Sequence, residues 1–193
     1  MACGLLTKGR GLDCNRISGG VKAVYFAVYD QVLSTTLGTG ADLGSITDID
    51  MGTSSVYKYT MPLGVASVTD TITGSRENGT IFYTPSINII LNRLTKEDQN
   101  QIKLLGATKT IILVELNATL ASNGHNVLIC LGRVNGMELN AGTMDSGAAF
   151  GDRGGYTLTF DGMENEPFQM LTDYSSTPLD NLDSGAQIPI VSS

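Results

Sequence analysis

The chain has 193 residues, of which 41% are hydrophobic and 16% charged, with 23 glycines, no tryptophan and a formal charge of −7. This length can bury a core without disulfides or metals, and the composition excludes an intrinsically disordered chain. No apolar run approaches the roughly 18 residues that cross a bilayer, so we expect no membrane segment. Met1 to Leu12 lacks the apolar segment of a secretory signal, which predicts synthesis in the cytoplasm.

The charge is unevenly distributed along the chain. From Val114 to Ser193 there are ten acidic residues against Arg133 and Arg153, whereas the first 36 residues have a small basic excess. Binding to nucleic acid needs clustered Lys and Arg, so this pattern argues against a tight grip on phosphates. It fits a surface past which nucleic acid slides, basic-to-acidic contacts between copies, or simply charge that keeps the protein in solution.

The three cysteines are interpreted as reduced and structural. Cys3, Cys14 and Cys130 are odd in number, and Cys130 lies within the apolar run Val127 to Leu131, where a thiol behaves as a small hydrophobic side chain. Their scattered positions have no metal-ligand spacing. We therefore expect neither a zinc site nor a cofactor.

Residues 1–20 are rich in Gly and polar residues without a sustained period, which predicts an extended N-terminal arm. Val21 to Leu33 begins the first strand, because Val24, Phe26 and Val28 alternate with other β-forming residues. This strand is predicted to be covered on both faces.

A long loop is expected over residues 34–64. Its first part, Ser34 to Gly52, contains four glycines and few strong apolar residues, and long loops of this kind are commonly functional or interface-forming. Its only strong apolar residues are Leu37, Leu43, Ile46, Ile49 and Met51.

Short strands are expected at Val56 to Met61 and Val65 to Thr73, the second of which has a Ser/Thr-rich face. Asn78-Gly79 is the strongest hairpin signal in the chain. The returning segment, Thr80 to Leu94, is predicted to divide into two strands at Pro85, which cannot donate to a ladder.

One short helix follows, capped by Thr95, with Glu97 and Asp98 in its first turn and ending near Gly106. It is too short to persist alone, so Ile102 and Leu105 are expected to dock on the sheet.

The second half of the chain predicts four further strands and an arm. Thr108 to Leu116 and Asn126 to Leu131 are nearly unbroken apolar runs, as strands buried on both faces are, with a hairpin between them. The other two strands are Val134 to Leu139 and Tyr156 to Asp161. Residues 172–193 are expected to form a C-terminal arm whose end can add to a neighbouring sheet edge.

No reactive constellation interrupts this pattern, and we predict that the chain is not an enzyme. His125, the only histidine, lies beside a hairpin tip and is interpreted as a turn residue rather than a catalytic base. Asp145 and Asp152 fall in the Gly-rich segment Gly142 to Gly155, which lacks a phosphate-loop or EF-hand pattern and is read as a turn with solvated carboxylates rather than a calcium site. A glycosidase with paired carboxylates remains an alternative, although no tryptophan is present to grip a sugar.

The order of elements, closing with GDRGGYTLTFDGMENEPF, resembles that of bacteriophage tail tube proteins and the related tube proteins of contractile injection systems. The resemblance covers residues 21–171, which it implies form one tail-tube-like domain. It implies a mainly β fold, a β-sandwich or open barrel with one short flanking α-helix and extended loop and terminal arms. It also implies that copies join into rings, usually hexamers, which stack into a hollow tube. The loop over residues 34–64 would then make the contacts between rings through Leu37, Leu43, Ile46, Ile49 and Met51.

The resemblance implies that the protein is a structural component of the virion tail, assembled in the host bacterial cytoplasm. Its partners are then other copies of itself and tail terminator, baseplate or sheath proteins, and DNA passes through the tube without specific binding. The residues expected to face the lumen are Thr69, Thr71, Asn88 and Asn92.

Other functions remain open. A capsid decoration protein, or a neck or terminator protein, would share the β-rich composition but form discrete particles. A small hydrolase or carbohydrate-binding module would be a monomer with a well-formed pocket.

Overall fold

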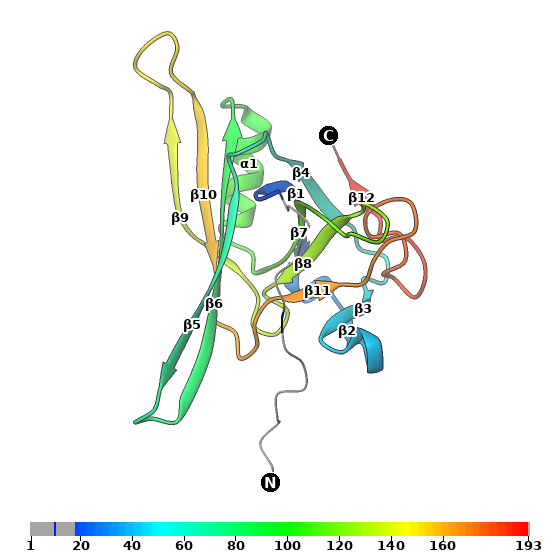
Figure 1. Ribbon diagram of the computed structural model, residues 1–193. Coiled ribbons are helices and arrows are strands. Elements are labelled where there is room, and N and C mark those ends of the chain that lie inside the picture. The colour runs from blue at the N-terminus through cyan, green and yellow to red at the C-terminus, as the bar shows by residue number, and fades with distance from the viewer. Residues whose placement is uncertain (1–9, 11–17, 193) are drawn as a thin grey trace.

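The computed structural model describes residue 10 and residues 18–192, and it shows a mainly β fold with two sheets and one α-helix, as predicted (Figure 1). The elements in chain order are β1 Val21–Val28, η1 Tyr29–Gln31, β2 Ser34–Leu37, η2 Gly40–Asp42, β3 Ser45–Asp50, β4 Val56–Thr60, β5 Ser67–Ser75, β6 Thr80–Asn92, α1 Lys96–Leu105, β7 Thr110–Thr119, β8 Asn126–Leu131, β9 Glu138–Asp145, β10 Gly155–Asp161, β11 Gln169–Leu171 and β12 Ile190–Val191.

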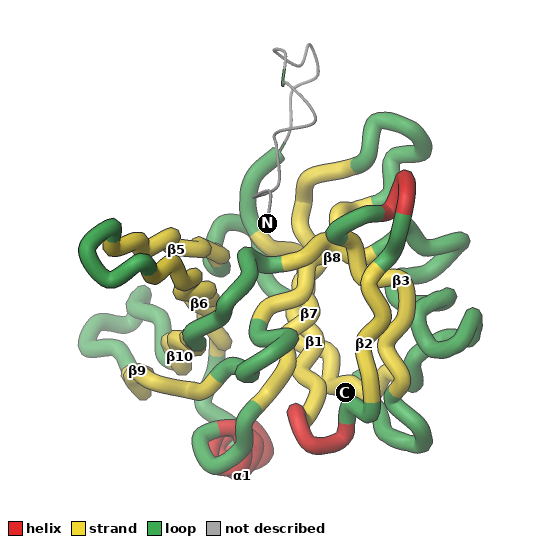
Figure 2. The backbone as a smooth tube through the Cα atoms, turned by 90° about the horizontal axis from the view of Figure 1, so that it is seen from below, coloured by secondary structure: helices red, strands yellow, loops and turns green. Residues whose placement is uncertain are grey.

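The larger sheet has eight strands in the order β12-β4-β1-β7-β8-β11-β3-β2. It curls so that β3 lies across from β1, and side chains of both strands pack into one buried cluster (Figure 2). The smaller sheet has the order β5-β6-β10-β9 and is antiparallel throughout. It packs on the other face of the larger sheet, which makes the fold a sandwich with one curled layer.

The three central strands β1, β7 and β8 serve two cores at once. In β7, Ile111 and Leu113 enter the cluster inside the curl, whereas Ile112 and Val114 enter the cluster between the two sheets. This alternation follows from the two-residue period of a strand, and it confirms the prediction that the apolar runs are buried on both faces.

Helix α1 has the predicted caps and position. The Thr95 side chain accepts a hydrogen bond from the Asp98 amide at 3.0 Å, and Gly106 is the C-cap. Ile102 and Leu105 pack against the cluster between the sheets, as expected. No helix in residues 18–192 is long and apolar enough to span a bilayer.

The hairpin at Asn78-Gly79 is confirmed as β5–β6, with Gly79 at a positive φ of 63°. The prediction that Pro85 divides the returning strand was wrong, since β6 is continuous. The Pro85 carbonyl accepts a hydrogen bond from the Gly162 amide, just beyond the end of β10. Because the N–H and C=O of one residue point to the same side of an antiparallel strand, the absent N–H of Pro85 would also face this side, where β10 has already ended. A proline at that position removes no bond to β5.

The expected loop over residues 34–64 contains three strands, β2, β3 and β4, so this part of the prediction was wrong. Ile46, Ile49 and Met51 are at most 1% exposed and fill this chain's own core, which makes them unavailable to other copies. Leu37 and Leu43 are exposed. The misinterpretation has a physical cause: short strands separated by glycine turns have too few residues to show an alternating pattern.

The C-terminal segment is also not an arm. Residues beyond Thr172 run back across the open side of the curl and bury Tyr174, Leu179, Leu182 and Ile188 in its core. The last strand, β12, adds in parallel to β4 of the same chain and not to a neighbour. Of the expected N-terminal arm, residues 1–9 and 11–17 lie outside the described residues.

Two strand boundaries also differ from prediction. The strand expected at Val134 to Leu139 begins at Glu138, because residues 132–137 form a turn with Gly132 and Gly136 at positive φ. It then continues to Asp145, through the first residues of the segment interpreted as a Gly-rich turn.

Burial of the C-terminal segment predicts that Leu182→Ala lowers the free energy of unfolding by about 2 to 5 kcal/mol, because it leaves a cavity in a fully buried site. Urea denaturation followed by circular dichroism measures this change. Val191→Ala, at a side chain that is 49% exposed, serves as the control. Equal, small effects of both substitutions would contradict this account.

Candidate functional site

The four residues expected to face a lumen lie together on one face of the small sheet. Thr69 is paired with Ser86 and Thr71 with Thr84, and Asn88 and Asn92 follow at two-residue intervals along β6. Directly opposite residues of an antiparallel pair point to the same side. Because Ile87 and Ile89 point into the core, this side faces away from it.

The outward face is dominated by hydroxyl and amide groups. Asn88 donates a hydrogen bond to the Thr159 hydroxyl at 3.0 Å, and the Asn140 amide donates to Asp161 at 2.9 Å. None of the four strands contains Lys or Arg. The acidic residues on this face are Glu138, Asp145 and Asp161, so it is polar and weakly acidic.

Both margins of this sheet are unpaired within residues 18–192. The edge strands β5 and β9 have nine and eight residues, whereas the edges of the large sheet, β12 and β2, have two and four. Long exposed edges are unusual in proteins that remain monomeric, because their backbone groups template pairing with another chain.

The alternation of hydrogen bonds along the strands identifies which backbone N–H and C=O groups of β5 and β9 point outward without a partner in the sheet. Since the Pro85 carbonyl points to the β10 side, Asp70 opposite it points away from β6, and so do Val68, Ile72 and Gly74. The same alternation across β10 leaves Gly142 and Met144 of β9 pointing outward. Nothing in the sequence separated these positions from their neighbours, because the signal depends on which strands pair.

The hairpins β5–β6 and β9–β10 project beyond the core at opposite ends of the molecule (Figure 1). Each carries large apolar side chains that its own chain does not cover. Ile72 is 65% exposed and Ile81 59% exposed on the first, and Met144 is 66% exposed on the second, beside a fully exposed Phe150 in the loop.

The loop that joins β9 to β10 is a capped turn, in agreement with the interpretation of Asp145 and Asp152. The Asp152 carboxylate accepts hydrogen bonds from the Ala149 and Ala148 amides, which lower its pKa. Asp145 accepts one from Gly147 at 2.9 Å. Both carboxylates are therefore used to stabilise the turn, and no cluster of three metal-ligating residues occurs in the described part of the chain.

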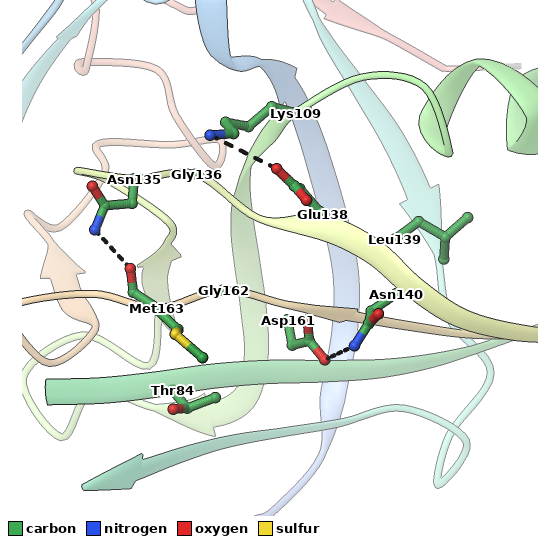
Figure 3. A pocket seen from close by; sticks show the side chains of 10 residues that line it. All are labelled: Thr84, Lys109, Asn135, Gly136, Glu138, Leu139, Asn140, Asp161, Gly162 and Met163. Atoms are coloured by element: carbon green, nitrogen blue, oxygen red, sulfur yellow. Dashed lines mark hydrogen bonds and ion pairs between the residues drawn. The ribbon is translucent and has the colours of Figure 1, made fainter. Parts of the chain in front are cut away.

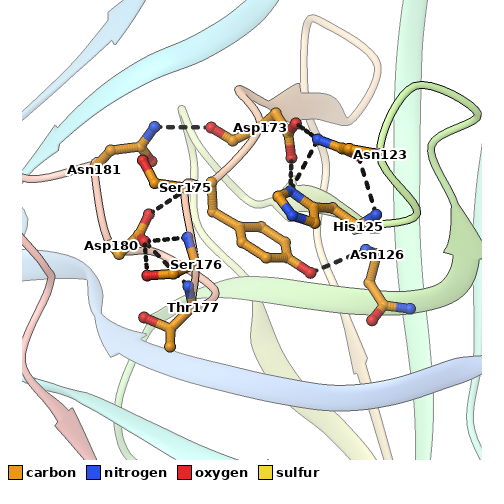
Figure 4. A network of polar contacts seen from close by, with 10 residues as sticks. Asn123, His125, Asn126, Asp173, Ser175, Ser176, Thr177, Asp180 and Asn181 are labelled. Atoms are coloured by element: carbon orange, nitrogen blue, oxygen red, sulfur yellow. Dashed lines mark hydrogen bonds and ion pairs between the residues drawn. The ribbon is translucent and has the colours of Figure 1, made fainter.

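His125 joins the β7–β8 turn to the C-terminal segment (Figure 4). Its ring stacks on Tyr174 with centroids 4.3 Å apart, and its Nδ1 lies 2.9 Å from an Asp173 oxygen. Asn123 also bonds to Asp173, and the Tyr174 hydroxyl accepts a hydrogen bond from the Asn126 amide. Each of these contacts joins the β7–β8 turn to the C-terminal segment, which supports a structural role for His125.

Asp180 holds the next turn of the same segment (Figure 4). Its carboxylate accepts hydrogen bonds from the backbone amides of Ser175, Thr177 and Ser176, which lower its pKa to about 2. The segment Ser-Ser-Thr-Pro-Leu-Asp, residues 175–180, is a local signal for such a turn, and the interpretation of this region as an arm overlooked it.

Two buried carboxylates lie among apolar residues. Glu115 is 1% exposed and accepts hydrogen bonds from Lys22 at 2.6 Å and Tyr25 at 3.0 Å. Burial raises the pKa of Glu164, whose carboxylate accepts hydrogen bonds from the Asn135 and Val134 amides. Both groups join strands or turns of the fold. Burial likewise raises the pKa of the Cys130 thiol to about 12, so this cysteine stays protonated, as a structural residue would.

A recess of about 600 Å³ lies at the start of β9 (Figure 3). Lys109 and Glu138 form an ion pair of 3.7 Å across it, and both side chains are substantially exposed. An exposed pair of this kind contributes little to stability or binding. The recess contains the Asn140–Asp161 and Asn135–Met163 hydrogen bonds, which satisfy its polar groups locally.

Comparison with known proteins leaves these features to be interpreted from the structure alone. No protein family model, no curated protein and no solved structure matches this chain.

The Asp180 turn predicts a defined pH dependence. The folded state favours the carboxylate, so its stabilising contribution is complete above a pH of about 4 and is lost as the pH falls towards the folded pKa of about 2. The melting temperature of Asp180→Asn should therefore lie below that of the original chain at pH 7, and the difference should shrink between pH 4 and pH 2. A difference that stays constant over this range would contradict the assignment.

Proposed function

We propose that this protein assembles with copies of itself into rings that stack into a hollow tail tube, through which phage DNA passes. The observation that supports this most is the pair of long unpaired edges on a sheet whose four strands contain no Lys or Arg. In this proposal β9 of one copy pairs with β5 of the next.

The strand directions support such pairing. Successive pairs from β5 to β9 are all antiparallel, so β5 and β9 run in opposite directions. When copies are related by rotation about an axis roughly along the strands, β9 of one copy meets β5 of its neighbour in antiparallel orientation. This contact uses different surfaces on the two copies, so it propagates until the ring closes and no edge remains.

The stagger of the small sheet also supports ring closure. The middle of β5 lies opposite Thr84 of β6, whereas the middle of β9 aligns with Asn88 and Ile89. This offset is roughly 15 Å along the strands, over a width of about 19 Å for four strands at normal spacing. Pairing the two edges fully then requires a strand tilt of about 40°, within the range of closed barrels.

The outward face would line the tube. Its hydroxyl and amide groups are neutral, and Glu138, Asp145 and Asp161 outnumber the Arg153 guanidinium, which donates to the Thr157 hydroxyl on this face at 3.0 Å. With so little clustered positive charge, DNA would pass without being held tightly. The proposed protein is thus a virion component assembled in the host bacterium. The hexameric ring, and contacts with terminator, baseplate or sheath proteins, rest on the family resemblance.

Negative-stain electron microscopy of the concentrated protein tests this function. Long hollow tubes or stacked rings are expected. Discrete closed particles would instead favour a decoration, neck or terminator protein, and a monomer at all concentrations would refute self-assembly.

The role of the β5 edge has its own test at Gly74, whose N–H points outward. Gly74→Pro removes this donor while Gly74→Ala keeps it, and a methyl group fits because the nearest atom is 3.9 Å away. We expect the proline variant to raise the protein concentration needed for half assembly by about threefold or more, from the loss of one hydrogen bond at each contact. Sedimentation velocity measures this concentration.

The alanine variant should assemble as the original chain does, and circular dichroism should show that both variants remain folded. If both variants assembled equally well, the β5 edge would not be the contact.

A further inference from the structure

An apolar groove runs between helix α1 and strand β9. It has a volume of about 300 Å³ and is lined by Ile102, Leu139, Met144, Tyr156 and Leu158. The Tyr156 and Leu158 side chains form part of the core, whereas Met144 is 66% exposed. The groove therefore lies on the core side of the small sheet, directly beside the unpaired edge of β9.

Ile72 is the matching exposed side chain at the other margin of the sheet. It lies on β5, on the same side of the sheet as the core, but its side chain is largely uncovered. Val68 lies four residues earlier in β5 and packs against the core, whereas Ile72 is 65% exposed.

We infer that Ile72 of one copy inserts into the α1–β9 groove of the neighbouring copy. This inference rests on the proposed function, because it requires β5 of one copy to pair with β9 of the next. It adds an apolar contact that sets the orientation and the register in which β5 of one copy pairs with β9 of the next. The strongest feature behind it is that the exposed side chain and the groove lie on the same side of one continuous sheet.

The strand alternation permits only pairings that put Ile72 on the groove side. The outward-pointing backbone groups of β5 belong to Val68, Asp70 and Ile72, and those of β9 to Gly142 and Met144. Hydrogen bonding between these sets, in the register closest to full overlap of the two edges, places Ile72 opposite Gly142, with like faces together. A slip by one residue would turn the Thr side into the groove and is disfavoured for that reason.

A second copy fits this groove better than an unrelated ligand does. The groove borders a row of backbone groups without a protein partner, which an added strand can pair with, and β5 supplies both such a strand and an apolar side chain. Gly142 lies along the groove without a side chain, and a Cβ there would already approach the Leu158 side chain at 3.0 Å. The glycine thus leaves room for the side chain of a strand laid beside it.

Cysteine cross-linking tests the contact directly. Ile72→Cys and Met144→Cys are introduced together, with Cys3 and Cys14 replaced by Ser, and the assembled protein is treated with a short bis-maleimide. Within one chain the two positions lie on opposite margins of a four-stranded sheet, at least about 14 Å apart at normal strand spacing, so cross-links form between copies. We expect a ladder of covalent oligomers from the double variant and only monomers and occasional dimers from either single variant.

A second variant measures how much the contact contributes. Ile72→Asp should raise the concentration needed for half assembly by about tenfold or more, as expected when a buried aliphatic contact is replaced by a charge. Leu33→Asp is the matched control, because Leu33 is 68% exposed but lies away from both edges of the small sheet. The control should assemble at the concentration of the original chain.

The outcomes separate this inference from the function on which it rests. Tubes or rings that form normally with Ile72→Asp, and give no cross-linked ladder, would overturn the Ile72 contact while leaving self-assembly intact. An original chain that remains monomeric at every concentration would overturn both.

Discussion

Everything in this fold depends on the two-sided burial of the central strands. Each of β1, β7 and β8 directs alternate side chains into separate cores, which requires a protein layer on both sides. The curl of the large sheet, closed by the C-terminal segment, provides one layer. The small sheet and α1 provide the other. Since the small sheet is held only through its inner face, its outer face and both edges are left to solvent or to another molecule.

The small sheet therefore has edge backbone groups that no strand of the same copy pairs with in the described residues. A four-stranded sheet with two long edges exposes many backbone donors and acceptors, and neither β5 nor β9 contains a lysine or proline that would block pairing. Its polar face cannot be the reason for pairing, because hydroxyl groups are well solvated. Backbone hydrogen bonding at the two edges would drive the pairing of copies. The polar outward face would determine which molecules can pass along the resulting surface.

The sequence predicted those parts of the fold whose signals are local. The apolar run at residues 108–116, the Thr95 cap and the Asn78-Gly79 turn each depend on neighbours in sequence, and each was confirmed. The prediction failed where burial depends on distant contacts. Ile46 and Leu182 lie in polar, glycine-containing segments, and only the curl of the large sheet brings them inside. The shared face of Thr69 and Asn88 was predictable from alternation, whereas the unpaired edges follow only from strand order.

Hydrogen exchange measured by mass spectrometry on dilute and concentrated protein tests the central claim most directly. If copies complete one another's small sheets, peptides covering residues 67–75 and 138–145 should exchange rapidly in dilute solution and become protected in the concentrated sample, while β2 at the edge of the large sheet stays unchanged. If the exchange rate of each of these two peptides were the same in dilute and concentrated protein, the account would be contradicted.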